Sequence, residues 1–309
     1  MTINFKEGIL IPIDKPYGVT SFKALAHIRY LCSHALGGKV KMGHAGTLDP
    51  LATGVLVLAT GKKTKQIETL QQHTKEYVAT IQLGATTVSY DMEHPVSATF
   101  PTEHITRELI LETLQQFIGE IEQIPPTYSA VKVNGVRAYD VRRNGEHIEI
   151  KPKHVRIDEI EVVSFDAEKM QLVLRVVCGK GTYIRALARD LGRACDSAAH
   201  ISALRRTASG VVSIGACHAV EELSPESAAG FALDPIAALG ATRVDLPGNL
   251  ADDLLCGRRI PVERALADFD ASKAPFALVL DGGLKVLARI EGGRFVMEHV
   301  FPQAIGGVR

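Results

Sequence analysis

The chain has 309 residues, of which 46% are hydrophobic and 23% charged, as is typical of a folded globular protein with a sizeable core. Because 35 basic residues balance 35 acidic ones, any nucleic-acid site must come from local clusters of charge. The five cysteines are widely spaced and form no Cys-x-x-Cys pair, which argues against a disulfide framework and a zinc site. We expect a cytoplasmic protein, since the N-terminus lacks a signal-peptide core and no apolar run approaches the roughly 20 residues of a membrane span.

Periodic apolar positions predict strands and helices in irregular alternation. In chain order we expect a strand at 8–13, a helix at 22–31, a strand at 54–60, a helix at 65–72, a strand at 77–83, a helix at 107–119, a strand at 170–178 and a helix at 183–194. This order favours a mixed α+β fold over a doubly wound sheet. Beyond about residue 241, β-type runs between Gly-Gly pairs predict a small β-rich module, and hence two domains at 1–240 and 241–309.

Basic residues concentrate in a few segments of this neutral chain. Val131–Arg156 carries seven Lys or Arg against three acids, a local charge of +4. Further basic side chains stand at Lys39, Lys41, Lys62, Lys63, Lys65, Arg205 and Arg206. Each cluster alone is compatible with an ordinary solvated face, but together they are candidates for gripping RNA phosphates.

Asp49 stands out in the segment Gly43-His-Ala-Gly-Thr-Leu-Asp-Pro-Leu-Ala-Thr-Gly54. The glycines and the Asp-Pro pair predict a tight, shaped loop. Asp49 has apolar neighbours, and a partly buried carboxylate is costly unless it is paired or used in chemistry. We therefore consider Asp49 a candidate nucleophile or general base. The alternative, a carboxylate that only caps the turn, fits these residues about equally well.

A second Gly-rich turn, Gly179-Lys-Gly-Thr-Tyr-Ile-Arg185, leads into the predicted helix at 183–194. Arg185 could pair with a buried carboxylate and keep it ionised, although an ordinary surface turn or a phosphate-binding helix start explains the motif as well. Tyr77 is either a core residue or a platform for stacking a nucleobase. His44 is either a satisfied loop histidine or an RNA contact.

Six motifs in order resemble the bacterial tRNA pseudouridine synthase B family, and together they cover residues 8 to about 215. They are Asp14-Lys-Pro-Tyr-Gly18, Gly43 to Leu56, Lys75-Glu-Tyr-Val78, Ile124-Pro-Pro-Thr-Tyr-Ser-Ala-Val-Lys-Val-Asn-Gly-Val-Arg-Ala-Tyr139, Gly179 to Arg185 and Ser202-Ala-Leu-Arg-Arg-Thr207. The C-terminal residues resemble, more weakly, the β-rich RNA-binding PUA module of that family.

The resemblance implies a largely antiparallel pseudouridine synthase sheet with a basic, thumb-like insertion at about 124–152. It implies that the enzyme flips a base out of the T-loop of tRNA and isomerises uridine 55 to pseudouridine without a metal or cofactor. Asp49 matches the nucleophile, Tyr77 the aromatic that stacks on uracil, and Arg185 the partner of the catalytic carboxylate. The remaining matches are His44, which displaces the target nucleotide, Tyr183 and Leu204, which line the uridine pocket, and Lys15 and Pro16, which brace the site. The T-arm of tRNA is the implied partner, with no obligatory protein partner and no membrane.

This chain departs from the family pattern at Ser89, His94 and Arg142, which affects loop detail rather than the nucleophile. Three alternatives stay open at this point. A non-catalytic RNA-binding or RNA-folding protein would use the same surface. A glycoside hydrolase would need a second acid, and none joins Asp49 in its loop. The archaeal and eukaryotic relative works inside a guide-RNA particle, whereas the full insertion after Ile124 favours the standalone type.

Overall fold

The computed structural model describes residues 5, 7–129, 132–133, 136–137, 150–224, 227–228, 230–247, 250, 253, 256, 258–265, 275–280 and 283–306. Much of the basic segment 131–156, with Arg142 and Arg143, therefore lies outside the described residues, as does part of the expected insertion. Among the described helices, none combines the length and the apolar character that a membrane span requires.

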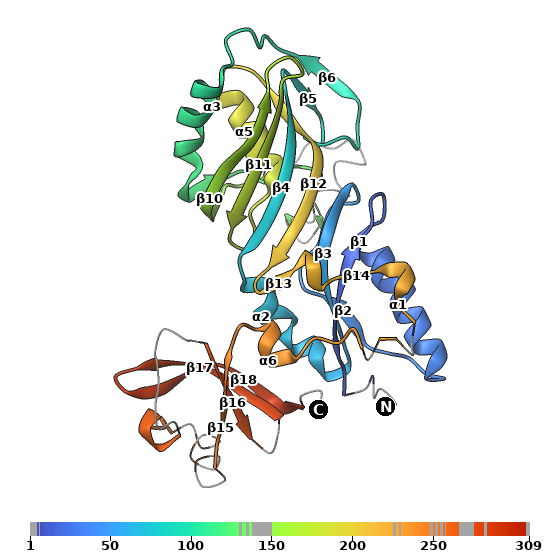
Figure 1. Ribbon diagram of the computed structural model, residues 1–309, viewed down its shortest axis with the longest axis vertical. Helices are drawn as coiled ribbons and strands as arrows, with labels where there is room; N and C mark the ends of the chain where they lie inside the picture. The colour runs from blue at the N-terminus through green and yellow to red at the C-terminus, as the bar shows by residue number, and fades with distance from the viewer. Residues whose placement is uncertain are drawn as a thin grey trace.

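The first part of the chain alternates strands and helices (Figure 1). It comprises β1 (Leu10–Lys15), α1 (Ser21–Ala35), β2 (Met42–His44), β3 (Ala52–Thr60), the 3₁₀ turn η1 (Gly61–Gln66), α2 (Ile67–Gln72), β4 (Lys75–Leu83), β5 (Ala85–Thr87), β6 (Val96–Thr99), α3 (Arg107–Leu114), η2 (Gln115–Phe117) and β7 (Gly119–Gln123). Next come β8 (Lys132–Val133), β9 (Val136–Arg137), β10 (Lys153–Asp166), β11 (Gln171–Cys178), α5 (Ile184–Ala194), β12 (Ala199–Ser209), β13 (Val212–Ser213), η3 (Ile214–Ala216), β14 (His218–Ala219), η4 (Val220–Glu222) and α6 (Pro235–Ala238). The C-terminal elements are β15 (Thr242–Asp245), η5 (Val262–Arg264), β16 (Phe276–Leu280), β17 (Gly283–Glu291) and β18 (Arg294–Gly306).

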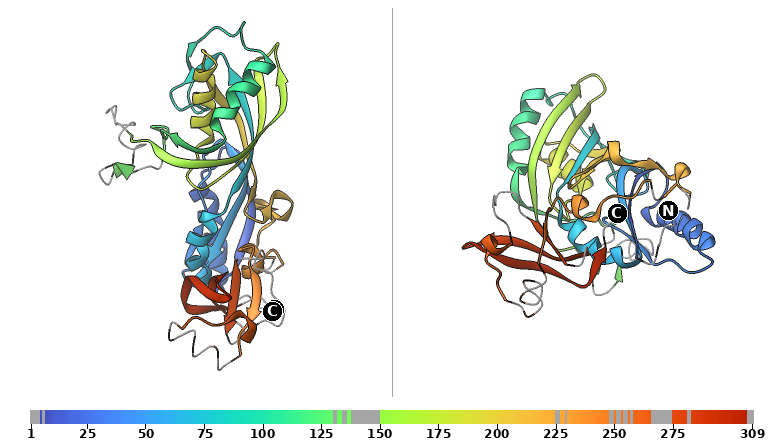
Figure 2. Two further views of the ribbon diagram at one scale, coloured as in Figure 1. Left: turned by 90° about the vertical axis from the view of Figure 1, so that its left-hand side faces the viewer. Right: turned by 60° about the horizontal axis from the view of Figure 1, so that its bottom comes forward.

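Within the described part of the chain, ten strands form one mixed sheet with the central order β14-β1-β3-β12-β4-β11-β10-β7. Strand β13 pairs with β12, and β2 pairs with β3. The β12–β3 and β1–β14 pairs are parallel and the other pairs antiparallel. Strands β7 and β10 reach sideways out of the body toward β8 and β9 (Figure 2). The sequence expectation of a mixed α+β fold is confirmed.

Helices cover the two parts of this sheet separately. In the upper part of Figure 1, α3 and α5 contribute Ile110 and Leu187 to an apolar cluster with strand residues such as Ile81 and Leu174. Lower down, α1 packs against β1 and β3 in a second cluster. The N-cap of α1 is Thr20, whose side chain accepts a hydrogen bond from Lys23 N. Packing thus fixes α1 and α5, which flank the Asp49 loop.

The C-terminal strands form a separate sheet with the order β15-β16-β17-β18. This sheet has its own apolar core, which includes Phe276 and Phe295. Other side chains of this sheet join a second apolar cluster that it shares with the large domain. In that cluster Phe301 of β18 belongs with Val57 of β3 and Leu70 of α2. The small sheet is therefore seated on the large domain through apolar contacts.

Two sequence expectations differ from the structure. The helix predicted to end at Gly119 ends at Leu114, because η2 follows it and Gly119 then begins β7 with a positive φ of 98°. The helix expected at 65–72 begins as the 3₁₀ turn η1, and α2 itself starts only at Ile67. In both places the chain leaves or enters a strand, so tertiary pairing overrides the apolar periodicity.

Candidate active site

The loop that carries Asp49 connects β2 to β3 and is held by the first turn of α1. Leu48 N donates a hydrogen bond to Ser21 Oγ (2.8 Å), and Ser21 Oγ donates one to Leu48 O (3.0 Å). Gly18 N donates to Pro50 O at 3.0 Å. These contacts bracket Asp49 on both sides, so its backbone is fixed before any substrate arrives.

Gly54 lets β3 approach β12 closely enough to form this loop. Its φ is +105°, and a Cβ built there would lie 2.1 Å from Arg206 O, so a larger residue cannot be accommodated. The parallel register pairs Ala52 with Leu204 and Gly54 with Arg206. The close approach therefore places the Asp49 loop beside the middle of β12.

Asp49 forms an ion pair with Arg185 at the start of α5. The distance from Arg185 Nε to Asp49 Oδ2 is 2.9 Å, while the side chain of Arg185 is 3% exposed and that of Asp49 is 37% exposed. Arg185 Nε lacks an aligned hydrogen-bond partner among the described residues, so the contact is ionic rather than a directed hydrogen bond. The buried guanidinium thus places its positive charge beside a half-exposed carboxylate and holds that carboxylate in one orientation, as a nucleophile requires.

The rest of the Arg185 guanidinium is held from two other directions. Its Nη1 donates to Ser89 O (3.0 Å) and its Nη2 donates to Tyr128 O (2.9 Å). Asp91 Oδ2 lies 3.4 Å from Nη1, and the Asp91 side chain is itself buried and accepts a hydrogen bond from Ser89 Oγ. The sequence analysis did not single out Asp91. This residue lies between Ser89 and His94, two positions at which the chain departs from the family pattern.

A cavity of about 530 Å³ opens beside this ion pair. Its lining includes five of the predicted site residues: Asp49, Tyr77, Tyr183, Arg185 and Leu204. They come from the β2–β3 loop, β4, the turn before α5, α5 and β12. The backbone N of Tyr183 donates to Gln123 Oε1 (2.8 Å), which ties this turn to β7. The fold thus brings together residues that lie far apart in the sequence.

The Tyr77 side chain is largely buried between its neighbours. Burial raises the pKa of Tyr77, and the positive charge of nearby Arg206 opposes that rise. The Tyr77 hydroxyl therefore stays protonated near neutral pH, so it can donate a hydrogen bond to a substrate but does not act as an anion. Burial likewise raises the pKa of Tyr183, and a hydrogen bond with Ser129 opposes that rise.

His44, Lys15 and Pro16 do not line the cavity. Lys15 is fully buried, and its Nζ donates to Pro16 O (2.8 Å), Val19 O (2.6 Å) and Pro50 O (3.2 Å). Burial lowers its pKa to about 8 despite the opposing attraction of Asp49. The half-buried His44 lies on β2, where burial and the charge of Arg206 lower its pKa. Lys15 thus supports the Asp49 loop through its bond to Pro50 O, without lining the cavity.

Three residues that the sequence suggested as phosphate contacts are not free to serve as such. Arg206 is 1% exposed, and it donates to Val55 O (2.7 Å) and Gly46 O (3.1 Å). Lys63 is also 1% exposed. Arg205 forms a forked ion pair with Asp14 at 2.6 and 3.2 Å. The suggested phosphate role is therefore wrong for the two buried residues, and the charge of Arg205 is already balanced.

Comparisons with known proteins identify the family. Residues 34–184 match the model of the N-terminal domain of the TruB family pseudouridylate synthases. The chain is 58% identical over 216 residues to a tRNA pseudouridine synthase B of Bacteroides fragilis, covering 70% of this chain and 92% of that protein. It is 37% identical over 282 residues to one of Mycobacterium bovis, covering 89% and 92%.

A solved structure, "Crystal Structure of a Cbf5-Nop10-Gar1 Complex", matches with a TM-score of 0.66 and 25% identity, over 96% of this chain and 85% of the matched one. No set of three or more His, Cys, Asp or Glu side chains that could hold a metal occurs among the described residues. The matching family model and the relatives that are 58% and 37% identical show that the chain belongs to the TruB family of pseudouridylate synthases.

Proposed function

We propose that the chain converts uridine 55 in the T-loop of tRNA to pseudouridine, with Asp49 as the nucleophile. The observation that carries this proposal is the Asp49–Arg185 ion pair at the edge of a cavity that Tyr77 and Leu204 also line. Relatives over 50% identical bear the name tRNA pseudouridine synthase B, which supports the same activity here.

The reaction is an isomerisation in which all atoms of the uridine are retained. The glycosidic bond from N1 to C1′ breaks, a bond from C5 to C1′ forms, and the proton lost from C5 is balanced by one gained at N1. Asp49 acts as an ionised carboxylate either at C1′ or at the base. Arg185 holds that charge in place, while the flat Tyr77 side chain supports the uracil as it turns. No external group is consumed.

Asp91 bears on the glycoside hydrolase alternative. A second carboxylate near Asp49 does exist, but Asp91 is buried and contacts the same guanidinium as Asp49. It is also absent from the lining of the 530 Å³ cavity. An acid that flanks a scissile bond must reach the substrate. Asp91 therefore acts on Arg185 and not on the ribose.

The RNA backbone has a basic route out of the active site. The 530 Å³ cavity shares Gln71 and Lys180 with a neighbouring groove of about 490 Å³. That groove shares Lys41 and Thr64 with a further hollow, which is lined by Lys39, Lys41, Lys62 and Lys65. Glu68 lines the groove, and Glu7 pairs with Lys62 (2.8 Å), so the net charge remains positive. Lysines along such a path attract phosphates.

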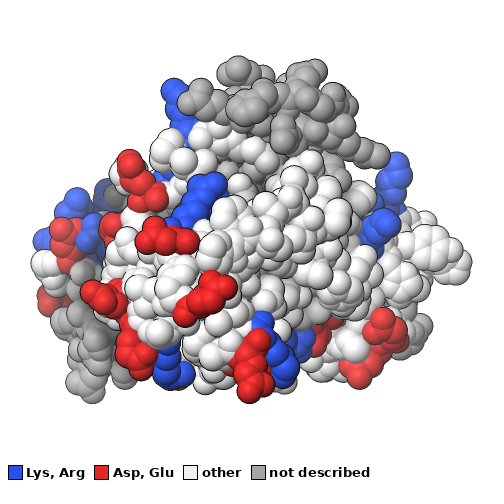
Figure 3. Space-filling model, turned by 90° about the horizontal axis from the view of Figure 1, so that it is seen from above, with Lys and Arg blue, Asp and Glu red and all other residues white. Residues whose placement is uncertain are grey.

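Charge is mixed on the face of the molecule that is seen from above in Figure 3. Acidic and basic side chains are interspersed around a broad uncharged area on the end of the molecule seen in Figure 3. The lysine-lined route is thus a local feature of the neutral chain, as its composition requires. We further propose that the C-terminal sheet is a PUA-like module that contacts tRNA beyond the T-loop, and that the enzyme works in the cytoplasm with its substrate.

The test is to map pseudouridine in a tRNA transcript incubated with the purified protein. We expect modification at uridine 55 alone, and none in a matched transcript that carries cytidine there. Asp49→Asn protein serves as the enzyme control. Absence of pseudouridine with wild-type protein, or pseudouridine at unrelated positions only, would contradict the proposal.

A further inference from the structure

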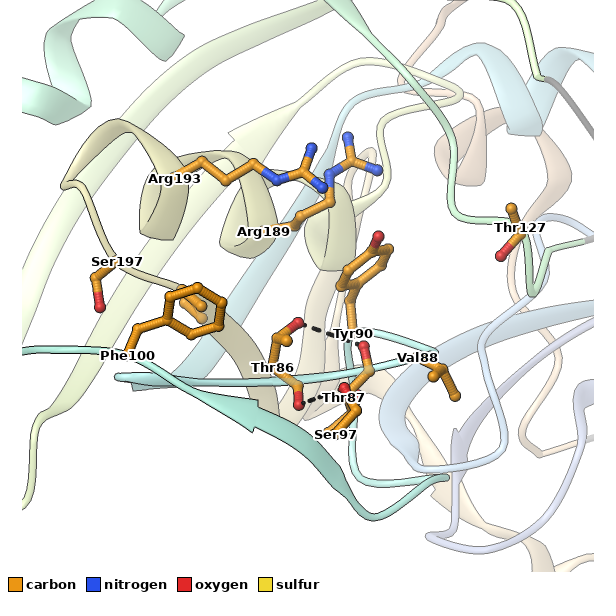
Figure 4. A pocket seen from close by; sticks show the side chains of 12 residues that line it. Thr86, Thr87, Val88, Tyr90, Ser97, Phe100, Thr127, Arg189, Arg193 and Ser197 are labelled. Carbon is orange, nitrogen blue, oxygen red and sulfur yellow. Dashed lines mark hydrogen bonds between the residues drawn. The ribbon is translucent and has the colours of Figure 1, made fainter.

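A second cavity, of about 410 Å³, lies outside the active site and shares none of the lining residues of the 530 Å³ cavity. It lies between α5 and the segment that runs from β5 to β6, and its side chains are drawn in Figure 4. Its size falls within the range of about 300–1,000 Å³ that is usual for small-ligand sites. The proposed reaction makes no use of it.

The charge of this cavity is positive. Arg189 and Arg193, one helical turn apart on α5, bring their guanidinium groups side by side over it in Figure 4. Arg189 is balanced by Asp190 through two contacts of 2.7 and 2.9 Å. The exposed Arg193 has no hydrogen bond or ion pair from its guanidinium to any residue that the structure describes, and no acidic residue lines the cavity. The cavity is therefore suited to an anion and not to a cation.

Aromatic rings form part of the cavity wall. Arg189 Cζ lies 5.2 Å from the centroid of the Tyr90 ring, so that ring extends the charged surface through a cation–π contact. Phe100 is 43% exposed, so its ring is accessible to a ligand, and it lies across the cavity from Arg189 in Figure 4. Rings of this kind bind flat, unsaturated groups by stacking.

Two hydroxyl groups of the lining, those of Thr87 and Ser197, are oriented as acceptors. Thr87 Oγ1 donates its proton to Asp91 O (2.7 Å), and Ser197 Oγ donates its proton to Pro101 O (2.8 Å). Because the protons of these two hydroxyls are already used, only their oxygen lone pairs remain for a ligand. The cavity therefore combines an arginine that is unpaired among the described residues, two aromatic rings and hydrogen-bond acceptors.

We propose that this cavity binds one nucleotide, with its phosphate against Arg193 and its base against Tyr90 and Phe100. A nucleotide carries an anion, a flat ring and N–H donors, which match the three features of the lining. The nucleotide is either free or part of the RNA, and the latter source rests on the proposed function.

Tyr90, which lines the cavity, connects it to the active site through the next residue of the chain, Asp91. Tyr90 adopts a positive φ of 61°, a strained conformation for a residue other than glycine. Its neighbour Asp91 contacts Arg185, which in turn pairs with Asp49. A base that stacks on Tyr90 is therefore linked to Asp49 through Asp91 and Arg185.

Binding of the four ribonucleoside 5′-monophosphates, and of inorganic phosphate, is measured by calorimetry. The proteins are the wild type, Arg193→Gln, Phe100→Ala and the matched control Arg107→Gln, which removes an exposed arginine of α3 outside the cavity. Because the three substituted side chains are exposed, the variants should fold, and circular dichroism checks this. We expect Arg193→Gln and Phe100→Ala each to weaken mononucleotide binding about tenfold, with Arg107→Gln unchanged.

The same proteins are then titrated with a T-arm stem-loop. A larger loss for Arg193→Gln than for Arg107→Gln assigns the nucleotide to the RNA, even if free nucleotides do not bind. A loss with mononucleotides alone assigns the site to a free nucleotide. The proposal is overturned if neither ligand distinguishes Arg193→Gln from Arg107→Gln, or if phosphate alone binds as tightly as the nucleotides. The calorimetry with mononucleotides does not depend on turnover, so it remains informative if tRNA is not modified.

Discussion

The active-site half of the molecule and the C-terminal sheet differ in what they bury. Seven charged side chains are buried among the described residues, and all precede residue 207: Lys15, Lys63, Lys75, Asp91, Arg185, Arg189 and Arg206. The C-terminal sheet instead buries apolar side chains such as Phe276, Phe295 and Phe301. Burying a charge costs free energy unless the charge is paired, so these charges indicate where chemistry and precise positioning are needed. Changes in the first region should therefore affect rate, and changes in the second stability and affinity.

The sharpest test of this difference is Asp49→Asn. The amide keeps the shape of the side chain but loses the nucleophile, so we expect turnover to fall by at least about a thousandfold with tRNA affinity nearly unchanged. Single-turnover assays and filter binding measure the two quantities. Activity within tenfold of the wild type would show that Asp49 is not the nucleophile.

Asp91→Asn should lower the rate by about ten- to a hundredfold, because it removes the carboxylate 3.4 Å from Arg185 while Asp49 stays in place. We expect the loss in kcat rather than in KM, since Asp91 does not line the 530 Å³ cavity proposed to take the uridine. Glu108→Gln, which changes an exposed carboxylate of α3 outside both cavities, is the control. An equal loss in both variants would mean that Asp91 acts only on folding.

Removal of residues 241–309 tests the C-terminal sheet. We expect binding of full-length tRNA to weaken about tenfold and to depend less steeply on salt, while an isolated T-arm stem-loop is still modified. The cut also uncovers part of the shared cluster around Val57 and Leu70, so the melting temperature should fall by about 5 °C or more.

Phe301→Ala is the matched variant for packing. It should lower the melting temperature without changing the salt dependence of tRNA binding. If removal of residues 241–309 lowered activity on full-length tRNA and on the stem-loop equally, the C-terminal sheet would be part of the catalytic fold.

Lys63 gives a smaller, pH-dependent effect where the two regions meet. It lies on η1, and burial lowers its pKa to about 8 from the ordinary value of 10.5, against the attraction of Asp234. Between these pH values the unfolded chain holds a proton that the native chain has released, so the contribution of Lys63 to stability rises with pH. From pH 8 to pH 9.5, the unfolding free energy of the wild type minus that of Lys63→Met should rise by about 1–2 kcal/mol. A flat difference would show that Lys63 titrates normally in the folded protein.

Periodicity alone located several elements well. The alternation at 77–83 predicted β4, and the apolar spacing at 183–194 predicted α5. It did not reveal β12, which is central to the sheet, because Arg205 and Arg206 interrupt its apolar pattern. A central strand normally carries few charges, so only their partners, Asp14 for one and backbone carbonyls for the other, explain how they are accommodated.

The sequence by itself predicted the mixed α+β fold, and its resemblance to the family, carried by six motifs in order, predicted a site that includes Asp49, Tyr77 and Arg185. Only the tertiary structure decided what surrounds them. It placed Asp91 on the far side of Arg185, and it turned Arg206 inward against Gly46 O while Arg205 faces Asp14. Neighbouring residues of a strand point to opposite faces, but which face is buried depends on the strands and loops packed against it. The sequence therefore shows which charged residues are present, whereas the strands and loops packed around them determine which are buried and with which partners.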